Sequence, residues 1–197
     1  MNKHTALLLP LCLLSACQSL PALDGRSVSH YVDAAAAPRL ESALRPAEAG
    51  AADARPQDSG IYLLADAHDA FVARATLIES ADHALDIQYY IWHNDVSGNL
   101  LFNMLYRAAD RGVRVRLLLD DNNTNGMDNI LAALNHHANI EIRLFNPFMN
   151  RKWRALGYLT DFPRLNRRMH NKSLTADNRA TIVGGRNIGD EYFNVAG

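Results

Sequence analysis

The chain has 197 residues, of which 48% are hydrophobic and 21% are charged. This composition is typical of a globular protein and excludes a collagen, a disordered tail and a small disulfide-rich protein. Its 20 basic and 21 acidic residues give a formal net charge of −1, which excludes a polycation that coats nucleic acid by charge alone.

The N-terminus has the features of an export signal. Lys3 supplies a positive charge, and residues 6–14 form an apolar stretch that is too short for a membrane-spanning helix, which needs about 20 residues. The sequence Leu14-Ser15-Ala16-Cys17 that follows resembles the lipobox of bacterial lipoproteins, in which the cysteine becomes the acylated first residue. We therefore expect residues 1–16 to be a signal peptide and Cys17 to anchor the protein in a membrane. An ordinary secretory signal with an incidental cysteine is the alternative.

The same resemblance implies a location and limits the chemistry. Gln18, rather than an aspartate, follows the cysteine, which implies the periplasmic face of the outer membrane of a Gram-negative bacterium. The two cysteines of the chain are Cys12, which would leave with the signal, and Cys17, which would be modified. A cysteine metal site, a cysteine nucleophile and an internal disulfide are then excluded together.

Residues 17–59 are expected to form a tether. Between Ala34 and Ser59 there are ten alanines, three prolines and no aromatic residue. Residues 40–44 can form a short helix, but the prolines divide the segment too often for a long one. The compact domain is expected to start near Gly60 and to continue to residue 197.

From Gly60 onward, helical and strand patterns alternate. Asp66 can cap a helix whose apolar stripe covers residues 70–81, and Gly112 can end a helix whose stripe covers 101–108. A further helical stripe covers 127–134. The segments 84–92, 113–119 and 140–144 read as strands. This order predicts an α/β domain with a largely parallel sheet. Tyr89, Tyr90 and Trp92 lie on the first strand and are expected to pack in the core rather than to contact lipid or base.

Two polar segments allow more than one interpretation. Residues 120–123 follow the second strand, where ligands of parallel sheets collect, but we favour a plain polar turn. Residues 151–154 combine three basic side chains with Trp153, which suits a membrane interface or a lipid head group, and equally a disordered exposed loop.

The charge is unevenly distributed along the chain. Residues 17–141 contain 9 basic and 17 acidic residues, whereas residues 142–187 contain 10 basic and 2 acidic residues. Such a basic segment attracts phosphate, polyanions or an anionic membrane surface, although a solvated basic face fits the same count.

The basic segment ends in a predicted hairpin. His170 and Lys172 are two residues apart on a strand-like stretch, so their side chains point to the same face. Asp177 and Asn178 supply a turn, and residues 180–185 return as a second strand. With Asp177 and Asn178 as the two central residues, Lys172 would face Val183 and His170 would face Gly185.

This arrangement predicts a phosphate site. Gly184 and Gly185 leave open space where side chains would otherwise block access to His170, and Asn187 would point to the same side. An imidazole can attack phosphorus, while an ammonium and an amide stabilise the charge on the non-bridging oxygens.

The spacing HxK(x)4D(x)6GGxN, from His170 to Asn187, resembles the HKD motif of the phospholipase D superfamily at each of its six defined positions. The segments ALDIQYYIWHND, RGVRVRLLLDDN and NIGDEYF resemble the amino-terminal half of bacterial enzymes of the cardiolipin synthase type. The resemblance implies one half-domain of a phospholipase D-like α-β-α sandwich with a mostly parallel central sheet. It also implies a phospholipid substrate, phosphatidylglycerol or a related lipid, and no cofactor or metal.

The resemblance further implies the residue roles. His170 would attack phosphorus and form a phosphohistidine, with Lys172 and Asp177 as the other catalytic motif residues and Asp177 in a structural or orienting role. Lys172 and Asn187 would bind the phosphate, and Gly184 and Gly185 would keep the pocket open.

The chain departs from the pattern because the family uses two such motifs and this sequence contains one. A second motif would come from a missing C-terminal half, which we favour, or from a homodimer partner. The resulting hypotheses are a phosphatidyltransferase of cardiolipin synthase type, a single-motif homodimeric phosphodiesterase or nuclease, and a non-catalytic lipoprotein that binds phosphate or lipid.

Overall fold

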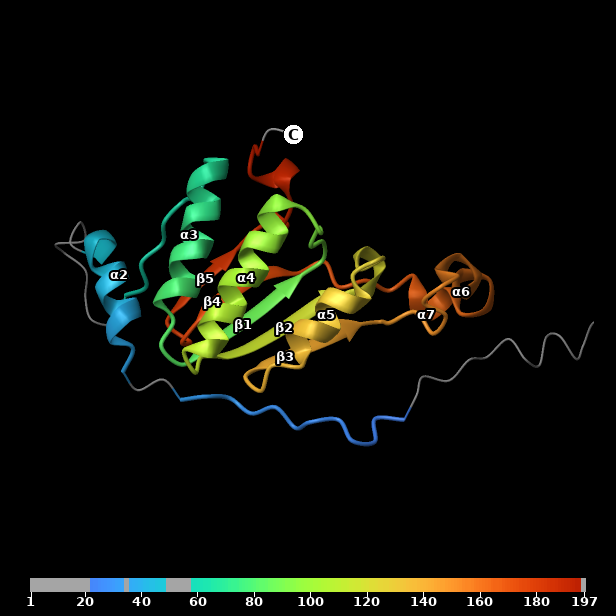
Figure 1. Ribbon diagram of the computed structural model, residues 1–197. Helices are drawn as coiled ribbons and strands as arrows, with labels where there is room; N and C mark the ends of the chain where they lie inside the picture. The colour runs from blue at the N-terminus through green and yellow to red at the C-terminus, as the bar shows by residue number, and fades with distance from the viewer. Residues whose placement is uncertain (1–21, 34–35, 49–57, 196–197) are drawn as a thin grey trace, which may run out of the picture.

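The computed structural model describes residues 22–33, 36–48 and 58–195 (Figure 1). The expected signal peptide and Cys17 lie outside the described residues. Within the described ranges, no helix is both long enough and apolar enough to cross a membrane.

A five-stranded sheet forms the centre of the domain, in the order β3-β2-β1-β4-β5 (Figure 1). Three strands are parallel to one another: β1 (Ala84–Tyr89), β2 (Arg114–Asp120) and β3 (Ile140–Phe145). The later strand β4 (Lys172–Ala176) is antiparallel to both β1 and β5 (Ala180–Val183). The expected α/β class with a mostly parallel sheet is confirmed. The first strand is shorter than expected, since it ends at Tyr89.

Helices α3 (Ala67–Ser80), α4 (Val96–Asp110) and α5 (Asp128–Asn135) cover one face of this sheet (Figure 1). Alternate strand residues point toward them and are buried. The largest include Leu85, Ile87, Tyr89, Leu117 and Leu119. The predicted helix signals are confirmed, because the Asp66 carboxylate accepts the first N–H groups of α3 and Gly112 adopts φ +94° after α4.

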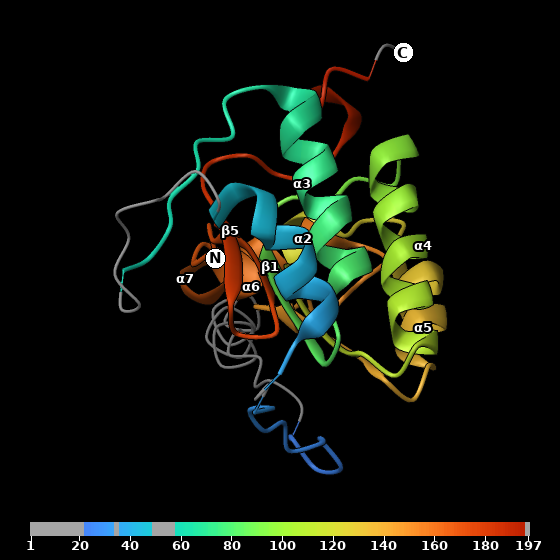
Figure 2. The same ribbon diagram turned by 90° about the vertical axis from the view of Figure 1, so that its left-hand side faces the viewer.

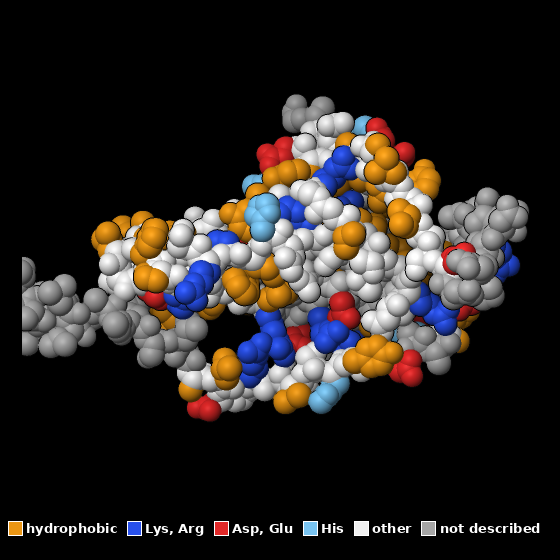
Figure 3. All heavy atoms as spheres, turned by 180° about the vertical axis from the view of Figure 1, so that it is seen from behind, with side chains coloured by type: hydrophobic (Ala, Val, Ile, Leu, Met, Phe, Trp, Pro, Cys, Tyr) orange, Lys and Arg blue, Asp and Glu red, His pale blue; other side chains and the backbone are white. Residues whose placement is uncertain are grey.

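The opposite face of the sheet is charged. Arg116 lies between Asp86 and Glu141 in the register of three neighbouring strands, and it forms an ion pair with Asp86. The extended segment 22–33 crosses this face, where the Arg143 guanidinium donates to the Ser27 carbonyl (2.8 Å). Figure 3 shows basic side chains gathered where the segment crosses.

The expected tether is partly helical, which corrects both its description and the start of the domain. α2 spans Pro38–Glu48 and lies against α3 (Figure 2). Ala37 and Leu40 are fully buried, so the core includes residues well before Gly60. The helix is longer than expected: Pro38 occupies its first position, which needs no N–H donor, and the helix continues through Pro46 to Glu48.

Two short helices, α6 (Arg154–Thr160) and α7 (Phe162–Leu165), follow β3 and project beyond the end of the sheet (Figure 1). Two 3₁₀ turns, η1 (Asp121–Asn123) and η2 (Asp190–Tyr192), complete the described elements.

Candidate functional site

The β4–β5 hairpin forms as predicted, but its register differs by one residue. Asp177 and Asn178 adopt left-handed φ values of 49° and 56°, and the Arg179 N–H donates to the Ala176 carbonyl (3.0 Å). Arg179 then bulges, so that Ala180 pairs with Ala176 and Val183 pairs with Ser173. The expected pairings of Lys172 with Val183 and of His170 with Gly185 are therefore wrong. Instead, the Gly184 N–H faces the Lys172 carbonyl at 3.4 Å.

His170, Lys172 and Tyr90 form one cluster where β1 ends and β4 begins. The Lys172 ammonium lies 3.2 Å from the Nδ1 atom of His170 and donates to the His170 carbonyl (2.9 Å). The Tyr90 ring lies 4.6 Å from the imidazole ring, and the Lys172 Nζ lies 5.3 Å from the centre of the Tyr90 ring. His170 is exposed, whereas Lys172 is buried, and burial lowers the pKa of Lys172. The imidazole thus faces solvent, and the buried Lys172 side chain lies beside it.

Open space surrounds both glycines of the motif, and Gly184 lies next to the Lys172 backbone. A Cβ atom added at Gly184 or Gly185 would meet no described atom within 4 Å. Asn187 is buried, and its side-chain oxygen accepts the Ile91 N–H (3.2 Å). Because Ile91 follows Tyr90, this bond ties the segment after the glycines to the end of β1. The structure therefore brings the histidine, the lysine and the glycine opening to one edge of the sheet, and Asn187 to the neighbouring backbone.

Asp177 lies outside this cluster. It is separated from Lys172 by the length of β4, which is about 16 Å for five residues. Its buried carboxylate accepts three backbone N–H groups, those of Asp82, His83 and Ala84, each at 2.8 Å. The structure thus corrects its grouping with the catalytic residues and supports the structural role: Asp177 holds the start of β1 against the hairpin.

Residues 120–123 do form a turn, and in addition the Asp120 and Asp121 carboxylates are buried and hold neighbouring backbone segments in place. Asp120 is fully buried, and it accepts the Met169 N–H (2.7 Å) and a bond from the Arg168 guanidinium (3.2 Å). Asp120 thereby positions the backbone immediately before His170. Asp121 is also fully buried and accepts the Phe148 N–H (2.7 Å), which fixes the start of the segment that leads to α6.

The basic segment 151–154 is ordered rather than a free loop. The Arg151 guanidinium binds both carboxylate oxygens of Asp121 (2.7 and 2.8 Å), and Arg154 donates to the Asp121 carbonyl (2.6 Å). These two arginines are therefore engaged by the protein, while Trp153 is exposed.

Sequence reasoning missed Tyr90 and Asp120. Tyr89 and Trp92 are buried as expected, but Tyr90 is half-buried and faces His170. The available signal was alternation along the strand, because Tyr90 directly follows the core residue Tyr89 and must point to the other side. For Asp120, the signal was its place at the carboxyl end of a buried strand.

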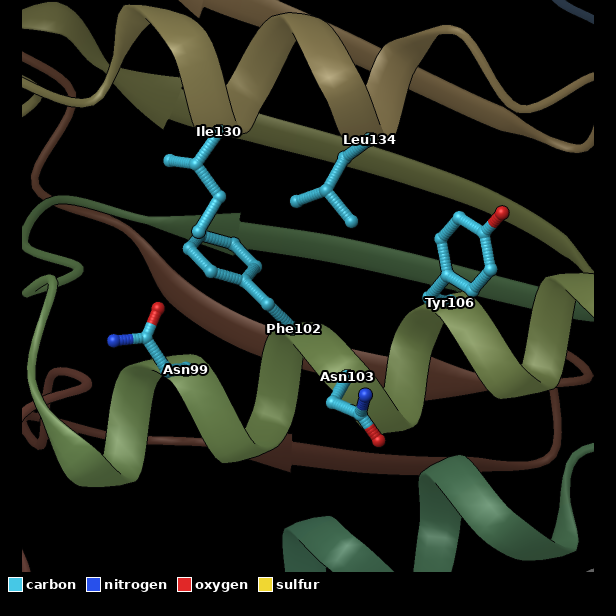
Figure 4. Close-up of a pocket in the computed structure, with 6 residues that line it drawn as sticks. All are labelled: Asn99, Phe102, Asn103, Tyr106, Ile130 and Leu134. Carbon is cyan, nitrogen blue, oxygen red and sulfur yellow. The ribbon is translucent and has the colours of Figure 1, made fainter.

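The described part of the chain has a groove away from the His170 cluster and no group of side chains suited to a metal ion. A groove of about 250 Å³ opens between α4 and α5 (Figure 4). It is lined by Asn99, Phe102, Asn103, Tyr106, Ile130 and Leu134, none of which belongs to the His170 cluster. The described residues include no group of three or more histidine, cysteine, aspartate or glutamate side chains placed to hold a metal ion.

Comparison with known proteins agrees with the motif. Residues 75–196 match the family described as "Cardiolipin synthase, PLD-like domain", where PLD denotes phospholipase D. This chain belongs to that family. The relatives of the PLD-like domain include Cardiolipin synthase C of Escherichia coli (strain K12), which is 60% identical over 156 residues, or 79% of this chain and 32% of that protein. An uncharacterized protein of Helicobacter pylori (strain J99 / ATCC 700824) is 44% identical over 141 residues, or 71% of this chain and 28% of that protein.

The chain thus spans about a third of the length of these curated relatives. Among solved structures, NucT from Helicobacter pylori is similar with a TM-score of 0.49 and 17% identity, covering 68% of this chain and 76% of that one.

Proposed function

We propose that this PLD-like domain supplies one half of the active site of a phosphatidyltransferase of cardiolipin synthase type, which acts on phosphatidylglycerol or a related phospholipid. The proposal rests on the cluster of exposed His170 and buried Lys172, next to the open space around Gly184 and Gly185. The 60% identity to Cardiolipin synthase C supports the choice of substrate class.

Each residue of the cluster has a role that follows from its position. Lys172 donates hydrogen bonds to the non-bridging oxygens of the phosphodiester and balances their charge. Gly184 and Gly185 leave room for the phosphate beside His170. The Tyr90 ring contacts both His170 and Lys172, so it restricts their orientations before substrate binds.

The reaction proceeds in two displacements. A ring nitrogen of His170 forms a bond to phosphorus while the bond from phosphorus to the leaving alcohol breaks, and a general acid gives that alcohol its proton. An acceptor alcohol, or water, then attacks the phosphohistidine, loses its proton to the same group and releases His170. The acid and base of both steps is the histidine of a second motif, contributed by another part of a longer chain or by a second copy of this one.

The test uses the protein isolated from its native membranes, so that any further part of the chain is retained. Mass spectrometry follows the conversion of phosphatidylglycerol into cardiolipin and glycerol. His170→Gln should reduce turnover by at least about 10³-fold, whereas His93→Gln, an exposed histidine outside the cluster, should leave turnover near that of the wild type. An acid-quenched phosphatidyl adduct on His170 would identify the intermediate.

Other results would favour other functions. Turnover that persists in His170→Gln would overturn the proposal. Phospholipid binding without turnover in the wild type would indicate a binding protein, and hydrolysis that appears only on dimerisation would indicate a single-motif phosphodiesterase.

We further propose that Cys17 is acylated and holds the domain at the periplasmic face of an outer membrane. The lipobox-like segment supports this location. Metabolic labelling with a fatty acid should mark the wild type and should not mark Cys17→Ser. Equal labelling of the two proteins would exclude this anchor.

A further inference from the structure

The projecting helices α6 and α7 carry an apolar surface that faces away from the domain. Trp153, Leu156, Leu159 and Phe162 are exposed by 60%, 51%, 81% and 54%. We call these four residues the outer face. Residues 153, 156 and 159 are spaced by three, which places them on one side of α6. Figure 3 shows hydrophobic side chains gathered at this end of the molecule, with basic ones beside them.

The inner side of α6 holds this orientation. Tyr158 donates from its hydroxyl to the Asn122 side chain (2.9 Å), and Arg154 donates to the Asp121 carbonyl. A Cβ atom at Gly157 would lie 2.8 Å from the Leu165 side chain, so the two helices are closely packed. The helix therefore leaves large apolar side chains on the side that faces solvent, where an ordinary surface helix carries polar ones.

The charges around the outer face are positive. Lys152 and Arg167 are exposed, and no ion pair between described residues includes either of them. Asp161 is the only acidic residue between positions 149 and 168, and it forms an ion pair with Arg164. An apolar surface with an exposed tryptophan and flanking cations fits the interface of an anionic bilayer.

A second copy of the chain fits this surface less well. A two-fold contact through the outer face would bring Lys152 and Arg167 of both copies into one interface. Like charges brought together in this way oppose association.

From these observations, we infer that the outer face of α6 and α7 inserts into an anionic phospholipid bilayer. Met169 lies three residues before the first residue of β4 and four after Leu165, and its N–H is held by Asp120. Docking of the outer face would therefore also set the height of His170 above the bilayer. This inference deepens the proposed function, because the bilayer is the source of the phospholipid substrate.

The chain contains its own reporter for the test. It has two tryptophans, of which Trp92 is 2% exposed and stacks on Phe102, so changes on vesicle binding report Trp153. The full chain is mixed with vesicles of phosphatidylglycerol and phosphatidylcholine that carry brominated acyl chains. We expect a blue shift and quenching of the emission, both weaker with phosphatidylcholine alone. An acyl anchor at Cys17 does not by itself bring Trp153 to the acyl chains.

Variants test whether vesicle binding depends on the outer face and its flanking cations or on other parts of the surface. Leu156→Glu with Leu159→Glu should reduce the quenching at least about tenfold, and Lys152→Glu with Arg167→Glu should remove the preference for phosphatidylglycerol. The matched control is Ile61→Glu, at a residue 97% exposed elsewhere on the surface, and it should behave as the wild type.

Two results would overturn the inference. One is the absence of quenching in the wild type. The other is a blue shift without vesicles that grows with protein concentration, which would make the outer face a contact between copies. Turnover of a soluble short-chain phosphatidylglycerol tests the proposed function separately, since it needs the His170 cluster but no bilayer.

Discussion

Replacing Asp177 by asparagine should destabilise the fold without weakening the phosphate site. The carboxylate is buried and accepts the Asp82, His83 and Ala84 N–H groups at 2.8 Å. Asparagine tolerates the left-handed backbone at φ 49° as well as aspartate does, so the substitution changes the charge and one acceptor atom only.

The size of the effect follows from those bonds. An amide oxygen still accepts one or two N–H groups, but its NH₂ group cannot accept any. Loss of one or two charge-assisted bonds, each contributing about 1.5–3 kcal/mol, gives an expected decrease of about 2–4 kcal/mol in the free energy of unfolding. A domain with the usual stability of about 5–15 kcal/mol stays folded after such a loss.

The assay combines urea denaturation, followed by circular dichroism, with titration of inorganic phosphate. Asn178→Asp is the matched control, because Asn178 belongs to the same turn, has φ 56° and is exposed, and the change removes only the exposed hydrogen bond that its amide donates to the Val32 carbonyl (2.8 Å). The control should stay within about 1 kcal/mol of the wild type. If Asp177→Asn kept full stability but lost phosphate affinity, Asp177 would act at the site and the structural reasoning would be refuted.

Three further predictions concern pH and packing. Burial lowers the pKa of Lys172, so phosphate affinity should fall as the pH rises through that lowered value, and Lys172→Arg should move the fall to higher pH in the same titration; an unchanged profile would assign it to another group. Hydrogen bonding from the Asp69 N–H lowers the pKa of Asp66, so its carboxylate stabilises the fold at neutral pH and this stabilisation is lost as the pH falls through the lowered pKa. Asp66→Asn should therefore lower the melting temperature at neutral pH, with a difference from the wild type that narrows in acid; a constant difference would contradict this reasoning. A Cβ atom at Gly98 would lie 1.9 Å from the His93 carbonyl oxygen, so Gly98→Ala should lower the free energy of unfolding by about 1–3 kcal/mol in urea, while Gly184→Ala, with open space around it, should not.

Short-range features could be predicted from the sequence alone because they depend on neighbouring residues. The cap at Asp66, the end of α4 at Gly112 and the turn at Asp177 follow from local backbone chemistry. The spacing from His170 to Asn187 likewise identified the family, since a motif is a property of the chain order.

Local sequence patterns did not predict the register of the β4–β5 hairpin, which differs from the expected register by one residue. A turn of two left-handed residues predicted the hairpin, but the bulge at Arg179 moved the register by one and changed the partner of Lys172. Such a bulge depends on how the hairpin packs on β1, which the turn residues themselves do not determine.

The sequence by itself therefore determined the helices and strands of the central α/β unit, the turn and the motif, whereas the tertiary structure decided which distant residues meet. Pairing of β4 with β1 brings Tyr90 to His170 and carries Asp177 to the far end of the strand. Burial of the Asp120 carboxylate beneath residues 168–169 shows that a polar turn also holds the backbone of the site. Periodicity says which side of an element is apolar, but not which other element covers it, because that choice is made by the packing of the whole domain.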